Sequence, residues 1–213
     1  MEMPLFPLHA VLFPGAPLPL QIFEPRYKAM MDRVLAGDRR FGVAAIRAGV
    51  EVGGPADVHT IGCIAEIERV QRAADGTMQL IANGVGRFRI IRRGPDDPYP
   101  VADVEEIDEH AGDVEPATLT VARAAMHRYL SAVARLSGEE VLAPALADAD
   151  PIAASFRLAA ALQLDVRDAQ ALLEAADARE RLELITQRAR SEAILLEAVG
   201  PSIGMPGRTF SEN

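Results

Sequence analysis

Side chains suited to catalysis or metal binding are few in this sequence, which has four histidines and one cysteine. The nearest pair with metal-ligating chemistry is His59 and Cys63. On a strand the two residues would share a face, but roughly 13 Å would separate them, whereas zinc ligands bond at about 2 Å. We therefore predict no metal site, and we interpret Cys63 as a small buried apolar residue.

Known catalytic motifs are missing as well. The sequence contains no G-x-x-x-x-G-K-[ST] phosphate loop, no G-x-S-x-G elbow and no H-E-x-x-H helix. Its one lysine, Lys28, lies in the first turns of a predicted helix. Glu105 and Glu106 are neighbours on a predicted strand, so they point to opposite faces and cannot act as a catalytic pair. We predict that the chain is not an enzyme and binds no cofactor.

Charge argues against a polyanionic partner. The net charge is −9, and the only run of basic residues consists of Arg87, Arg89, Arg92 and Arg93. Nucleic-acid binding requires a basic surface, so we do not predict a nucleic-acid partner. We interpret the run as a solvated outer strand face that balances acidic neighbours. The alternative is a small site for an acidic or carboxyl-terminal group of a peptide.

The expected location is the cytoplasm. A single cysteine cannot form an intramolecular disulfide, which is typical of a reducing compartment. Residues 3–23 contain five prolines, more than a membrane helix tolerates, and the first basic residue is Arg26. We therefore expect no secretory leader and no membrane partner.

The elements that would position these residues change in kind near residue 110. Before it, short apolar runs predict strands over 41–46, 61–70, 77–82, 87–93 and 99–107. Asp75-Gly76 predicts a hairpin, whereas Asn83-Gly84 is compatible with a second hairpin or a bulge. One helix is predicted from Pro25 to about Ala36.

The chain after residue 110 is rich in alanine and leucine and predicts helices. A helix over 113–136 should stop at Gly138, and capping signals at Asp150, Asp165 and Asp177 begin three more, the last over 177–199. The polar residues 201–213 are predicted to form a flexible tail. We expect two parts that pack against each other, 1–110 and 111–200.

The stretch PLFPLHAVLFPGAPLPLQIFEPRY over residues 4–27 resembles the opening signature of the Lon N-terminal domain family. Phe41-Gly42, Gly62, Asp75-Gly76 and GVGRF over 84–88 follow in that family's order. The resemblance implies an α+β fold: a PUA-like, partly open β-barrel with one inserted helix over 1–110, followed by a C-terminal helical bundle over 111–200.

Most of the signature is predicted to be architectural. Prolines within strands belong at sheet edges, because they cannot donate to a ladder. The apolar residues of the signature, Phe23 among them, are expected to fill the core, and Gly15 and Gly62 suit turns or bulges.

The resemblance also implies a function, the non-catalytic recognition of unfolded or extended protein segments, without ATPase or protease domains. A Lon protease is a further candidate partner. The expected site is an apolar groove between barrel and bundle. The alternatives are a PUA-like RNA-binding protein and an uncharacterised hydrolase.

Four residues in the two most family-like motifs are predicted to bind peptide: Arg26, Tyr27, Arg87 and Phe88. They combine planar contact groups with charge, the chemistry that dominates many binding hot spots. A structural role is the alternative, with Glu24 capping the helix N-terminus and Arg26 as its ion partner. Phe88 is equally compatible with a place in the core.

Overall fold

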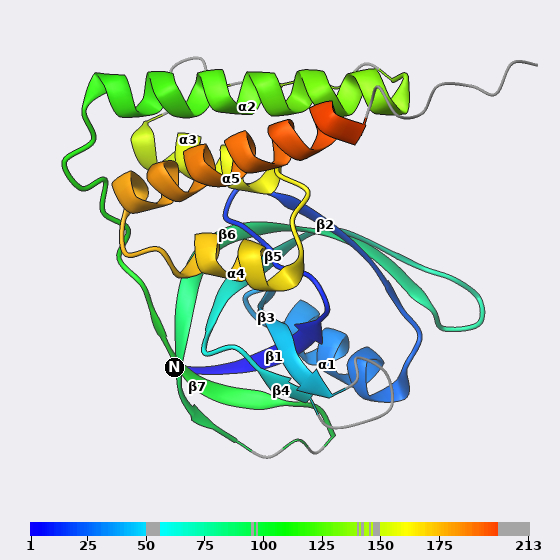
Figure 1. Ribbon diagram of the computed structural model, residues 1–213. Helices are drawn as coiled ribbons and strands as arrows, with labels where there is room; N and C mark the ends of the chain where they lie inside the picture. Colours follow the sequence, from blue (N-terminus) through cyan, green and yellow to red (C-terminus); the bar gives the residue numbers. More distant parts are fainter. Residues whose placement is uncertain are drawn as a thin grey trace, which may run out of the picture.

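The computed structural model of the protein describes residues 1–49, 56–94, 96, 98–139, 141, 143, 144, 146 and 150–199. It has an α+β architecture in which a sheet lies below a layer of four helices, while α1 packs on the sheet's other side (Figure 1). The strands are β1 Glu2–Leu8, β2 Pro17–Ile22, β3 Arg40–Gly49, β4 Ala56–Val58, β5 Ile61–Arg72, β6 Met78–Arg93 and β7 Val101–Glu106. The helices are α1 Pro25–Ala36, α2 Pro116–Ser137, α3 Pro151–Ala160, α4 Val166–Glu174 and α5 Ala178–Val199.

The strands pair in the order β1-β7-β6-β5-β3-β4, mostly antiparallel. β1 also pairs in parallel with β3, so five of the strands close a ring. β4 pairs with β3 outside this ring, and β2 pairs with β6 outside it, so the sheet is more than a simple barrel.

The local turn signals agree with the structure. Asp75-Gly76 forms the turn between β5 and β6, with Gly76 at φ 78°. The two runs predicted over 77–82 and 87–93 are one continuous strand, β6. Its register with β5 shifts beside Gly84, because Ile64 pairs with Gly86 and Ala65 pairs with Gly84. Asn83-Gly84 therefore belongs to a bulge and not to a second hairpin.

Capping residues place the helix ends. Asp150 accepts hydrogen bonds from the backbone N–H groups of Ile152 and Ala153, and Asp165 accepts one from Asp168. Gly138 ends α2 in the left-handed conformation, which a residue without a Cβ adopts at least cost. α2 begins at Pro116 and not at Asp113, because the proline occupies its first position.

The buried side chains show how the two parts of the chain meet. One cluster joins α1 to the strands through Phe6, Tyr27 and Phe41. Another contains most of the buried apolar residues of α2 to α5 together with Phe13 and Ile61 of the strand-rich part. The two parts therefore share apolar packing, as expected. The domain limits 1–110 and 111–200 stay a prediction, and residues 201–213 lie outside the described residues.

Candidate functional site

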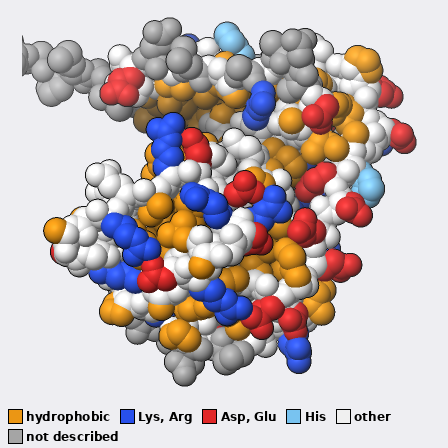
Figure 2. Space-filling view, turned by 180° about the vertical axis from the view of Figure 1, so that it is seen from behind, with side chains coloured by type: hydrophobic (Ala, Val, Ile, Leu, Met, Phe, Trp, Pro, Cys, Tyr) orange, Lys and Arg blue, Asp and Glu red, His pale blue; other side chains and the backbone are white. Residues whose placement is uncertain are grey.

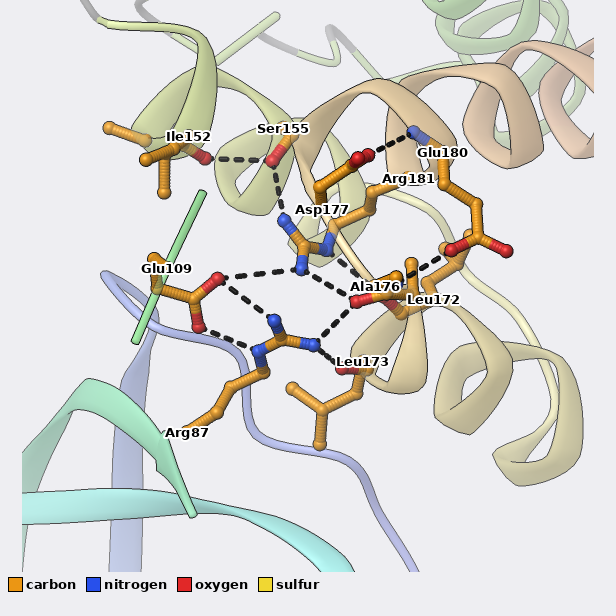
Figure 3. A network of polar contacts seen from close by, with 12 residues as sticks. Arg87, Glu109, Ile152, Ser155, Leu172, Leu173, Ala176, Asp177, Glu180 and Arg181 are labelled. Atoms are coloured by element: carbon orange, nitrogen blue, oxygen red, sulfur yellow. Dashed lines mark hydrogen bonds and ion pairs between the residues drawn. The ribbon is translucent and has the colours of Figure 1, made fainter. Parts of the chain in front are cut away.

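A buried network of arginines joins the sheet to the helices (Figure 3). Arg87 on β6 donates two hydrogen bonds to the carboxylate of Glu109, at 2.6 and 2.9 Å. Its remaining terminal nitrogen donates to the carbonyl oxygens of Leu173 and Ala175, at 2.6 and 2.7 Å. Carbonyls at a helix C-terminus lack helical partners and carry partial negative charge. Arg87 thus stabilises the end of α4 and fastens it to the sheet.

Arg181 of α5 completes the network from the other side. It donates to the carbonyl oxygen of Leu172 and to the Ser155 hydroxyl, at 3.0 and 2.9 Å. Its guanidinium carbon lies 3.7 Å from the ring centroid of Phe156. Burial, together with the nearby Arg87 charge, lowers the pKa of Arg181 to about 10, so it remains a cation at neutral pH. Glu109 is the one carboxylate that contacts both arginines in the described part of the chain.

The interpretation of Arg87 as part of a solvated strand face is wrong. Its side chain is 2% exposed, because α4 and the segment carrying Glu109 cover this part of β6. Gln170 of α4 is buried as well and donates to the carbonyl oxygen of Ile61 at 2.9 Å. The junction is closed here, so the groove predicted between barrel and bundle does not pass through Arg87.

Phe88 is fully buried, and two glycines make room for its ring. A Cβ at Gly42 would lie 2.9 Å from the ring, and one at Gly62 would lie 2.5 Å from it, both closer than van der Waals contact allows. Gly62 is therefore needed for close packing and not for the turn or bulge we expected.

Tyr27 and Arg26 stand at the start of α1. Tyr27 is buried, with its ring centroid 4.4 Å from that of Phe6. Arg26 lies over the Tyr27 ring at 4.5 Å and pairs with Glu24 at 3.1 Å. The expected ion pair is present, but the Glu24 side chain makes no capping hydrogen bond. The peptide-binding role of Arg26, Tyr27, Arg87 and Phe88 stays a prediction, and the structure does not bring the four together.

Carboxylates neutralise most of the basic run. Besides Arg87, Arg92 pairs with Asp103 and Arg93 with Asp96, whereas Arg89 is exposed. Across the described residues, no three histidine, cysteine or acidic side chains are grouped to hold a metal ion. None of the described helices is long and apolar enough to span a membrane.

An exposed surface is found where β5 and β6 extend as a hairpin with β2 alongside, at the right of Figure 1. The register places Gln21, Gln79 and Gln71 in one row across the three strands. Pro19, Ile81 and Arg69 form the adjacent row on the same face, because their positions differ by two residues along each strand. We call these six exposed residues the hairpin face.

Two grooves meet at this surface. One, of about 630 Å³, is lined by all six residues of the hairpin face. The second, of about 180 Å³, shares Pro19 and Gln21 with the first and continues to Phe23 and Tyr27. Phe23 is 55% exposed, so its expected place in the core is wrong. Hydrophobic side chains also gather over the strands and below the helical layer when the molecule is seen from behind (Figure 2).

The free edge of β2 is unsuited to pairing with another strand. The N–H of Gly84 donates to the carbonyl oxygen of Ala16, so alternate residues from Ala16 onward face β6. Pro17 and Pro19 therefore face the open edge, where proline lacks the N–H that a new strand would need. A polypeptide partner would contact the side chains of the hairpin face rather than extend the sheet.

Sequence reasoning missed this surface, although a signal was present. The strands P-L-P-L-Q-I and R-V-Q alternate, with the leucines and valine on one face and the prolines and glutamines on the other. Alternation predicts which residues share a face, but it does not predict which strands are neighbours. The row of glutamines depends on the pairing of β2 and β5 with the same part of β6.

Solved structures share this α+β fold. A Lon N-terminal domain protein from Xanthomonas campestris is 27% identical, with a TM-score of 0.66, and the match covers 88% of this chain and 98% of that one. The N-terminal domain of a Mycobacterium avium complex Lon protease matches with a TM-score of 0.64 at 21% identity, over 89% of this chain and 98% of that one. The fold is thus that of Lon N-terminal domains.

The family model for the substrate-binding domain of ATP-dependent protease La (LON) matches residues 2–189. The chain belongs to this family. A Lon protease from Syntrophus aciditrophicus is 28% identical over 92% of this chain, and Lon protease 1 from Syntrophobacter fumaroxidans is 30% identical over 92% of it. The matches cover 25% and 24% of those proteins, so this chain spans about a quarter of their length.

Proposed function

We propose that this protein is a non-catalytic module that recognises unfolded or extended protein segments through the hairpin face. Membership of a family described as a substrate-binding domain supports this class of function. The observation that carries the proposal is the exposed surface of glutamine, isoleucine and proline side chains along the 630 Å³ groove.

The two rows of the hairpin face have complementary chemistry. A primary amide both donates and accepts hydrogen bonds, so Gln21, Gln71 and Gln79 could pair with the backbone of a segment of any sequence. Ile81, Pro19 and the nearby Phe23 offer apolar surface for its side chains. Unfolded segments expose both kinds of group, whereas folded proteins bury most of them.

The remainder of the molecule would hold this face in place. In this proposal the ring of strands is a partly open barrel of the PUA-like kind, and α2 to α5 form a bundle that the Arg87 network fixes to it. No step of the function requires ATP hydrolysis or peptide cleavage. A Lon protease is a candidate partner, because the similar proteins carry that name.

One observation disfavours the RNA-binding alternative. Three of the four arginines in the basic run are paired with carboxylates, so the run provides little free positive charge. The net charge of −9 would repel a polyanion as well.

Binding can be tested with one ligand protein in two states, unfolded and native. Fluorescence anisotropy would compare labelled lactalbumin that is reduced and carboxymethylated, and so stays unfolded, with the native form. We expect saturable binding of the unfolded form only, with no change in its length on a gel and no ATP consumption. A mixed RNA pool serves as the third ligand. Binding to RNA but not to the unfolded protein would contradict the proposal.

A further inference from the structure

A second surface, separate from the hairpin face, lies along α5. Glu183, Gln187, Arg190 and Ile194 are spaced by three or four residues, so they form a stripe on one side of the helix. The buried residues of α5, among them Leu182, Ile185 and Ala189, lie on the other side. Exposure along the stripe agrees with this placement, and Ile194 is 55% exposed.

The stripe borders a groove between α5 and α2, which run side by side (Figure 1). This groove measures about 570 Å³. Its α2 wall includes Ala117 and the exposed Val121, and its α5 wall includes Glu183, Gln187 and Arg190. An apolar side chain of a partner would therefore find an apolar wall on α2 and charged positions on α5.

The charges of the stripe are self-complementary. Glu183 and Arg190 stand two helical turns apart, with Gln187 between them. Glu183 contacts Arg179 at 3.0 Å, whereas Arg190 has no ion pair with any residue that the structure describes. When two identical helices pack antiparallel about a two-fold axis, the two ends of the stripe face each other reciprocally. Glu183, although it also contacts Arg179 of its own helix, is thus opposite in charge to the Arg190 that it would face in a second copy, and this holds at both contacts of the pair.

We infer that a second copy of this chain binds here, α5 against α5, with the two-fold axis beside Gln187. Glu183 of each copy then faces Arg190 of the other, and the two Gln187 amides meet at the axis, where each can donate to the other. Ile194 of each copy lies beyond Glu183 of the other, where it packs against the stem of the exposed Arg179. The net charge of −9 on each copy opposes association, so the reciprocal ion pairs supply the specificity.

Charge reversal tests this pairing directly. Sedimentation and light scattering should give a mass of about 46 kDa for the native protein, twice the 22.9 kDa of the chain. In a dimer of Glu183→Arg, or of Arg190→Glu, residues 183 and 190 carry the same charge at both contacts. We therefore expect each variant alone to have a dimer dissociation constant at least tenfold higher than that of the native protein.

The two variants also provide their own control. Mixed in equal amounts, they should form a heterodimer, because opposite charges then face each other again at both ends of the stripe, and the double variant should dimerise with itself. Thermal melting shows whether each variant is folded, and the heterodimer itself shows that both folds are competent. A native protein that is monomeric at about 100 µM, single variants that dimerise as the native protein does, or a mixture that fails to pair would overturn the inference.

Discussion

Glu109 places its carboxylate against the guanidinium of Arg87, with both oxygens in hydrogen bonds of 2.6 and 2.9 Å. The two residues are 22 positions apart, and the two carbonyl oxygens that accept the other hydrogen bonds of Arg87 lie at the C-terminal end of α4, more than 80 positions away. This one ion pair therefore links the strand, the segment that leaves the sheet and the helical layer.

Replacing Glu109 with alanine should destabilise the protein strongly. Arg87 and Arg181 would keep their charges inside the junction without a carboxylate to balance them, and breaking a buried ion pair costs about 3–5 kcal/mol. Chemical denaturation would measure the loss. Glu105→Ala, which removes an exposed carboxylate from β7, is the control and should change stability by less than about 0.5 kcal/mol. Equal stability of the two variants would show that the Arg87 network contributes little.

Alanine variants separate structure from recognition at three of the four residues predicted from the sequence. Tyr27→Ala and Phe88→Ala remove buried aromatic side chains and should cost roughly 3–5 kcal/mol. Arg26→Ala leaves the Phe6–Tyr27 contact in place and should change stability much less. Melting and binding of unfolded lactalbumin would be measured on the same samples. Binding lost by Arg26→Ala at unchanged stability would assign that residue to the recognition surface.

The glycines beside Phe88 predict a specific rescue. Gly42→Ala should destabilise by about 1–3 kcal/mol, because the atoms nearest to its methyl group would be side-chain atoms of Leu5 and Phe88, at 2.8 and 2.9 Å. Gly42→Ala should therefore cost less stability when it is introduced into a Phe88→Leu variant than when it is introduced into the native protein. The same second change should not rescue Gly62→Ala, whose methyl group would also clash with the backbone carbonyl oxygen of Val43. Denaturation of the double-mutant cycle measures both couplings, and equal rescue at the two glycines would contradict the packing described.

Cys63 should be inert in the native protein. Burial raises the pKa of its thiol from 9.0 to about 12, so the reactive thiolate is scarce at pH 8. A chromogenic disulfide reagent should react with it only after unfolding. Because the folded-state pKa is the higher one, the stability linked to this thiol is fully present below pH 9 and decreases as the pH rises from about 9 towards 12. Rapid reaction of the native protein at pH 8 would mean that Cys63 is accessible.

Local signals in the sequence predicted many of the elements, since each depends on neighbouring residues. Asp75-Gly76 marks a turn, Pro25 begins α1 and Gly138 ends α2. The role of Arg87 could not be predicted in the same way. On β6, Arg87 and Arg89 lie on either side of the apolar Phe88, and this alternation is equally typical of a strand with one exposed face. Arg87 is buried only because α4 packs over it. Phe23 illustrates the reverse case, an aromatic residue in an apolar run that the fold leaves exposed.

The most direct test of the hairpin face uses two exposed isoleucines of the same strand. Ile81 lies on that face, whereas Ile91, 61% exposed, lies near the other end of β6. Each would be changed to glutamate, and the affinity for unfolded lactalbumin would be measured by anisotropy, with melting curves to confirm comparable stability. We predict that Ile81→Glu weakens binding at least tenfold, about 1.4 kcal/mol, while Ile91→Glu stays within about twofold of the native protein. Equal binding by both variants, at native strength, would contradict recognition through the hairpin face.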